Sequence, residues 1–134
     1  MKYIETLSRS IDTLDLKIGI IGMGYVGLPL SLAFSEKNFT VYGIDINNEK
    51  VNKLNSGESY IKHIDSTRIR KVINNKTLRG TSNFSVISEL DALVICVPTP
   101  LTKYREPDLS YIKNTLKLIA PYLHKGLLIS LEST

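Results

Sequence analysis

Short apolar runs alternate along this chain with segments in which apolar residues recur every three or four positions. The runs that we predict to be strands lie at residues 17–21, 40–45, 78–82, 92–97 and 127–131. Continuous apolar runs of about four to eight residues are typical of strands buried on both faces of a parallel sheet. The run at 78–82 is the weakest of the five.

The segment 26–37 has helical spacing and follows the first predicted strand. Leu28, Leu32 and Ala33 fall on one side of this predicted helix. Pro29 lies in its first turn, where a missing backbone N–H costs little. We therefore expect a helix that starts directly after a glycine-rich stretch.

Three further helices are predicted from capping residues and spacing. Asn47 or Asn48 caps the first, Ser66 caps the second and Asp108 caps the third. Pro121 is expected to kink or shorten the last turn of the third helix. The apolar positions of that third helix are Leu109, Ile112, Leu116, Ile119 and Leu123.

Strands separated by helices predict parallel pairing with right-handed crossovers. The expected fold class is therefore α/β, a Rossmann-type doubly wound and mostly parallel sheet with helices on both faces. Residues 1–16 form an N-terminal extension of one or two amphipathic helical turns or an ordered tail, and residues 17–134 form one domain. Because the chain stops at Thr134, at the ligand-binding edge of such a sheet, we expect this domain to be truncated.

Composition narrows the possible partners. The hydrophobic content of 43% suffices for a packed core, and 17 Lys and Arg against 13 Asp and Glu favour small anionic ligands. These basic residues are dispersed, which argues against nucleic acid. His63 and His124 stand alone, so no metal site is predicted. With neither a signal peptide nor a membrane span in the sequence, we expect a cytoplasmic protein that does not bind membranes.

Residues 22–27 read Gly-Met-Gly-Tyr-Val-Gly, a GxGxxG motif between a predicted strand and a predicted helix. Gly22 would permit the tight turn out of the strand, Gly24 would let a diphosphate approach the backbone, and Gly27 would let the helix pack closely. The helix N-terminus would offer N–H groups and partial positive charge to the phosphates.

Asp45 lies at the tip of the second predicted strand, 18 residues beyond Gly27. Its carboxylate can accept hydrogen bonds from ribose hydroxyls, whereas it would repel a 2′-phosphate. Since no arginine directly follows Asp45, the motif predicts NAD as cofactor and disfavours NADP.

Four strings resemble the N-terminal domain of the UDP-glucose/GDP-mannose dehydrogenase family: IGMGYVGLPLSLAF, YGIDIN, VICVPTPL and LEST. The resemblance runs from Lys17 to the end of the chain. The segments SYIKHID and PTPLTKYREPDLSYI are more similar to the UDP-N-acetylhexosamine branch, especially UDP-N-acetylglucosamine 6-dehydrogenases. The alternatives are a UDP-glucose 6-dehydrogenase, a hydroxyacid-type NAD oxidoreductase and a non-enzymatic NAD-sensing module.

The resemblance implies NAD-dependent oxidation of a sugar C6 alcohol to a carboxylate by a larger, homodimeric protein. A C-terminal domain outside this chain would bind the UDP-sugar and supply the nucleophilic cysteine. Thr134 would help to relay water or a proton near the reacting carbon. The cofactor positions implied by the motif and the family are Gly22, Met23, Gly24, Tyr25, Val26, Gly27, Asp45, Lys50, Thr99, Ser133 and Thr134.

Cys96 is the single cysteine of the chain. It lies in a strongly apolar predicted strand, where a thiol is an inert core residue with a raised pKa. We therefore expect no catalytic role for Cys96.

Overall fold

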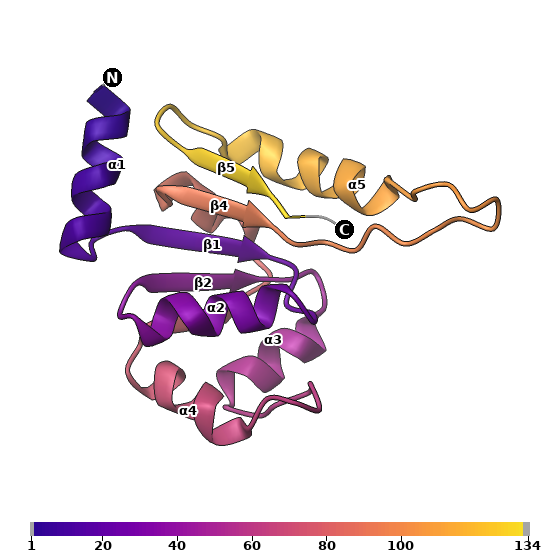
Figure 1. Cartoon of the computed structure of the whole chain (residues 1–134), viewed down its shortest axis with the longest axis horizontal. Helices are drawn as coiled ribbons and strands as arrows, with labels where there is room; N and C mark the ends of the chain where they lie inside the picture. The colour runs from indigo at the N-terminus through magenta and orange to yellow at the C-terminus, as the bar shows by residue number, and fades with distance from the viewer. Residues whose placement is uncertain (1, 133–134) are drawn as a thin grey trace.

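The computed structural model describes residues 2–132 and contains one five-stranded parallel sheet with the order β3-β2-β1-β4-β5 (Figure 1). The strands are β1 (Lys17–Ile21), β2 (Thr40–Ile44), β3 (Leu78–Thr81), β4 (Ala92–Ile95) and β5 (Leu128–Leu131). The α-helices are α1 (Lys2–Thr13), α2 (Gly27–Glu36), α3 (Asn48–Asn55), α4 (Ser66–Asn74) and α5 (Ser110–Ile119), and the 3₁₀ helices are η1 (Phe84–Glu89) and η2 (Ala120–Tyr122). This strand order confirms the predicted Rossmann-type fold class.

Parallel pairing brings the carboxyl ends of the strands to one edge of the sheet. Ile20 of β1 is in register with Gly43 of β2 on one side and with Val94 of β4 on the other. The segments that follow β1, β2 and β4 therefore start side by side. Ligands of open α/β sheets bind at this edge, where the order of the strands reverses.

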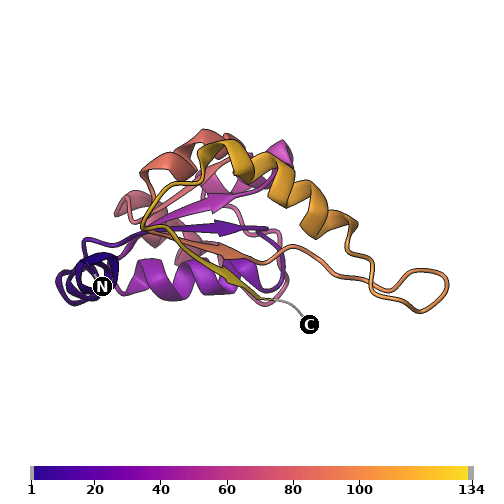
Figure 2. The ribbon, with the colours of Figure 1, turned by 90° about the horizontal axis from the view of Figure 1, so that it is seen from above.

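Helices cover both faces of the sheet, with α2 and α5 on opposite sides (Figure 2). One core joins β1 to α2, α3 and α4 and includes Ile20, Leu28 and Leu32, all fully buried. The other core lies between the sheet, η1 and α5 and includes Leu93 and Ile119, both also fully buried. Full burial of one such side chain contributes about 1.5–3 kcal/mol, so the first core fixes β1 and α2 firmly relative to each other.

Most predicted elements are present, but several details differ. Leu109, not Asp108, is the N-cap of α5, and the Asp108 carboxylate accepts from the Ser110 N–H at 2.9 Å. The N-terminal extension is one α-helix of 12 residues, longer than the expected one or two turns. Asp65, not Ser66, caps α4 and accepts a hydrogen bond from the Thr67 N–H. Ala33 lies on the exposed side of α2, because the buried side runs through Leu28, Ser31, Leu32 and Ser35.

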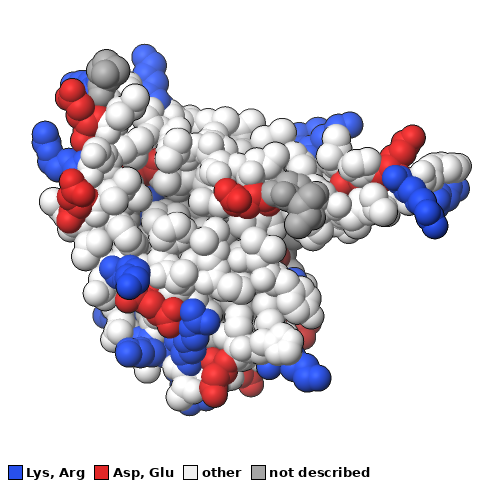
Figure 3. Space-filling view, viewed as in Figure 1, with Lys and Arg blue, Asp and Glu red and all other residues white. Residues whose placement is uncertain are grey.

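The apolar residues of α5 and its flanking positions are more exposed than their helical spacing predicts. Leu109, Leu116 and Leu123, expected to face the core, are 47%, 48% and 45% exposed. In α5 the buried residues are Ile119, as predicted, and Thr115, which the apolar pattern did not include. Because β5 is an edge strand of the sheet, the residues around α5 have less core to pack against. Figure 3 shows that the surface over β4 and β5 is largely free of charged side chains.

No helix among residues 2–132 combines the length and the apolar character that crossing a bilayer would require.

Candidate functional site

The turn between β1 and α2 has the shape that its glycines predict. Gly22 adopts φ +96°, and a Cβ there would lie 2.7 Å from the Cys96 carbonyl oxygen. A Cβ on Gly27 would overlap the carbonyl oxygen of Gly22. These two glycines allow the chain to leave β1 and begin α2 against the turn itself, as the sequence indicated.

The middle of this turn faces open space. A Cβ on Gly24 would meet no described atom within 4 Å. The side chains of Tyr25 and Val26 are 80% and 51% exposed, and no described side chain caps the N-terminus of α2 at Val26. The turn therefore presents backbone, with the positive end of a helix, to the surroundings.

Met23 is held in place by its backbone and by its side chain. Its N–H donates to Asp45 Oδ2 at 2.8 Å, and its carbonyl oxygen accepts from the Tyr60 hydroxyl at 2.7 Å. The side chain is fully buried, with its sulfur accepting from Ser31 Oγ at 3.5 Å. Met23, predicted to contact the cofactor, is thus an anchor of the turn, and its side chain lies in the core.

Asp45 follows β2 directly and is 9% exposed. Its Oδ2 accepts from Met23, and its Oδ1 accepts from the Asn47 N–H at 2.9 Å. Asn47 in turn caps α3, because its side chain accepts from the backbone N–H groups of Glu49 and Lys50. Each carboxylate oxygen has a second acceptor position, so Asp45 can bind a ligand without releasing its protein partners.

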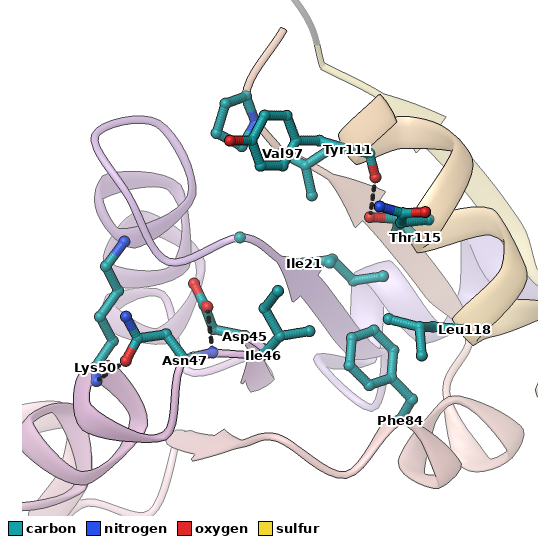
Figure 4. Close-up of a pocket in the computed structure, with 13 residues that line it drawn as sticks. Ile21, Asp45, Ile46, Asn47, Lys50, Phe84, Val97, Tyr111, Thr115 and Leu118 are labelled. Atoms are coloured by element: carbon teal, nitrogen blue, oxygen red, sulfur yellow. Dashed lines mark hydrogen bonds between the residues drawn. The ribbon is translucent and has the colours of Figure 1, made fainter. Parts of the chain in front are cut away.

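Two neighbouring clefts open at the carboxyl edge of the sheet, and both are lined by Gly22, Asp45, Lys50, Val97 and Pro98. The first cleft, of about 330 Å³, lies between the end of β2 and α5 (Figure 4). Its further lining residues are Ile21, Ile46, Asn47, Phe84, Tyr111, Asn114, Thr115 and Leu118. The mostly apolar lining suits a flat, uncharged ring system.

The second cleft, of about 320 Å³, lies over the glycine-rich turn. Its further lining residues are Gly24, Tyr25, Val26, Cys96, Thr99 and Glu132. The structure therefore brings together nine of the predicted cofactor positions: Gly22, Met23, Gly24, Tyr25, Val26, Gly27, Asp45, Lys50 and Thr99. Ser133 and Thr134 lie outside the described residues.

Cys96 lies just beyond β4 and is half-buried. Desolvation by burial, reinforced by the nearby Glu132 carboxylate, raises the pKa of this thiol above its ordinary value. A protonated thiol is a weak nucleophile, so the environment agrees with the expected inert character of Cys96.

The segment 98–107 contains three prolines and forms a long loop, as predicted. Leu101 and Pro107 form an isolated antiparallel bridge, and the Lys103 ammonium lies 5.1 Å from the centre of the Tyr104 ring. The loop projects away from the sheet (Figure 1). Its charged tip is therefore separate from the glycine-rich turn.

Sequence reasoning missed Tyr60 and most of the lining of the first cleft. Phe84 lies in η1, which has no helical periodicity in the sequence, and Tyr111 and Leu118 resemble ordinary positions of an amphipathic helix. The spacing of short motifs carries no information about contacts between such distant segments. Within residues 2–132, no group of three or more His, Cys, Asp or Glu is placed to hold a metal ion.

Comparison with known proteins places this geometry among nucleotide-sugar dehydrogenases. Residues 16–134 match the UDP-glucose/GDP-mannose dehydrogenase family, NAD binding domain. The UDP-N-acetyl-D-mannosamine dehydrogenase of Escherichia coli (strain K12) is 40% identical over 117 residues, which are 87% of this chain and 27% of that protein.

Two further matches agree. The NDP-N-acetyl-D-galactosaminuronic acid dehydrogenase of Ralstonia nicotianae is 36% identical over 96% of this chain and 30% of its own length. The crystal structure of the enzyme of that name from Methanosarcina mazei Go1 superimposes with a TM-score of 0.81 at 37% identity, covering 89% of this chain and 27% of its own. The chain thus spans less than a third of the length of these relatives.

Proposed function

This chain belongs to the UDP-glucose/GDP-mannose dehydrogenase family as its NAD-binding domain, and we therefore propose that the two clefts at the carboxyl edge of the sheet hold NAD between them. The observation that carries the proposal is the open backbone at Gly24 beside the anchored Asp45 carboxylate. A diphosphate fits the first of these features, and a ribose fits the second.

The diphosphate would lie in the second cleft against residues 24–27. Backbone N–H groups and the positive end of α2 favour an anion there, and the open space at Gly24 permits close approach. Lys50 lines both clefts and would add a positive charge near the phosphates. Thr99, at the start of the long loop, would contact the nicotinamide half.

The adenosine half would occupy the first cleft. Asp45 would accept from the ribose hydroxyls, while the adenine ring would pack between apolar side chains such as Ile46 and Leu118. A 2′-phosphate placed beside the Asp45 carboxylate would bring like charges together at a cost of about 4 kcal/mol near a protein surface. This arrangement selects NAD over NADP.

Isothermal titration calorimetry of the chain with NAD and with NADP tests the proposal. We expect NAD to bind and NADP to bind at least about tenfold more weakly, because of the repulsion at Asp45. Absence of NAD binding, or tighter binding of NADP, would refute it. ADP-ribose serves as control, since it contains every group assigned here except the nicotinamide.

We further propose that the whole protein carrying this domain oxidises the C6 alcohol of a UDP-N-acetylhexosamine to the uronate, with a substrate domain outside this chain. The support is the N-acetyl-D-mannosamine named in the E. coli relative and the N-acetyl-D-galactosaminuronic acid named in the Ralstonia relative, at 40% and 36% identity. The resemblance of segments 59–65 and 98–112 to UDP-N-acetylglucosamine 6-dehydrogenases supports UDP-N-acetylglucosamine within this class, although neither of these relatives is named for that sugar. An assay of NADH formation with UDP-N-acetylglucosamine, UDP-N-acetylmannosamine and UDP-glucose would discriminate these substrates.

A further inference from the structure

Tyr60 lies 37 residues from Met23 in sequence and contacts it directly in the fold. It belongs to the segment between α3 and α4, within the string SYIKHID, and sequence reasoning assigned it no role in the site. Its hydroxyl donates to the Met23 carbonyl oxygen at 2.7 Å, while its half-buried ring packs against the core of α2 and α4.

The segment that carries Tyr60 is itself fixed. Ile61 and Ile64 are 7% and 8% exposed and belong to the same core. The Ser59 N–H donates to the Ser66 side chain at 2.9 Å, and Ser59 Oγ donates to the Ile61 carbonyl. These contacts fix the segment around Tyr60, so its side chain lies in a defined position against the glycine-rich turn.

Tyr60 and Asp45, from two different loops, each form a hydrogen bond with the backbone of Met23. Asp45 accepts from the N–H of Met23, and Tyr60 donates to its carbonyl. The two peptide planes that flank Met23 are thereby fixed, and the second of them leads directly into Gly24. Its orientation sets the direction in which the following N–H groups of the turn point.

We propose that Tyr60 is a positioning residue of the cofactor site, which holds the glycine-rich turn in its diphosphate-binding conformation before the ligand arrives. The inference rests on the proposed binding of NAD at this turn. Holding the turn in advance removes an ordering cost that binding would otherwise have to offset.

The hydroxyl of Tyr60 is suited to this role at all ordinary pH values. Burial, followed by the effect of the Asp45 carboxylate, raises the pKa of Tyr60 far above its usual value. The hydroxyl therefore stays protonated and remains a donor to Met23.

The test variant is Tyr60→Phe, which retains the ring and removes the hydroxyl. Loss of one hydrogen bond that orders the turn should raise the Kd for NAD about fivefold. Tyr42→Phe is the matched control, because Tyr42 is also half-buried but packs against the core on the other face of the sheet. Its Kd should equal that of the unmodified chain.

A methyl signal reports on the turn itself. The chain has two methionines, Met1 and the buried Met23, so ¹³C-methyl labelling of methionine gives a simple spectrum. We expect Tyr60→Phe to shift or broaden the Met23 signal without ligand, and saturating NAD to return it toward its normal position.

Two results for Tyr60→Phe would overturn the positioning role. One is a Kd for NAD within twofold of that of the unmodified chain, and the other is a raised Kd with an unchanged Met23 methyl signal. Failure of the unmodified chain to bind NAD is a separate outcome, which would refute the proposed function and this inference with it.

Discussion

Replacing Asp45 with alanine is expected to weaken NAD binding roughly tenfold to a hundredfold. A hydrogen bond to a charged group contributes about 1.5–3 kcal/mol, and the ribose would lose its charged acceptor. NADP should lose less affinity than NAD, because the repulsion of its 2′-phosphate disappears together with the carboxylate. The preference for NAD should therefore narrow, and calorimetry with both cofactors measures the two effects.

The Asp45→Ala variant also leaves the Met23 N–H without its acceptor, so some stability is lost, about 1–3 kcal/mol. Asp91→Ala is the control that separates the loss of stability from the loss of binding. Asp91 Oδ2 also accepts a hydrogen bond from a backbone N–H, that of Lys17, but at the amino ends of the strands, away from the cofactor site. This control should bind NAD normally. Equal NAD affinity of Asp45→Ala and the unmodified chain would show that Asp45 does not touch the cofactor.

A second large effect is expected for the stability of Gly27→Ala. The added methyl group would overlap the Gly22 carbonyl oxygen, which belongs to the backbone. Because the backbone also fixes the position of the methyl carbon, neither atom can move aside alone. Either α2 must shift away from the turn or the turn must open. Overpacking of this kind costs roughly 3 kcal/mol or more, and the unfolding midpoint should fall by roughly 10 °C.

Thermal unfolding followed by circular dichroism measures this loss. Gly24→Ala is the matched control, since it adds the same methyl group three residues earlier in the turn, where no described atom lies within 4 Å. Its midpoint should stay within about 2 °C of the unmodified chain. A Gly27→Ala protein that is as stable as this control would contradict the packing of α2 described above.

The sheet and the glycine-rich turn could be predicted because their signals are local. The apolar runs of β1, β2 and β4 report burial on both faces, and the spacing of Gly22, Gly24 and Gly27 reports a turn that only small residues allow. The position of Asp45 follows from the same logic, since parallel strands end at one edge.

The remaining parts of the site depend on contacts between distant segments. The hydrogen bond from Tyr60 to Met23 and the place of Phe84 in the first cleft follow from how the loops pack, and no periodicity in the sequence encodes either. The leucines of α5 show the opposite case. Their helical spacing is correct, but only the sheet topology reveals that they lie beside an edge strand and stay exposed.

Titration of Gly24→Ala with NAD tests most directly the claim that the NAD diphosphate lies against the backbone at Gly24. Within residues 2–132 a methyl group there meets no atom within 4 Å, so we expect it to act on binding through a ligand that occupies the open space. We predict a stable protein whose Kd for NAD is at least about tenfold higher than that of the unmodified chain. A stable variant that binds NAD as tightly as the unmodified chain would contradict the claim.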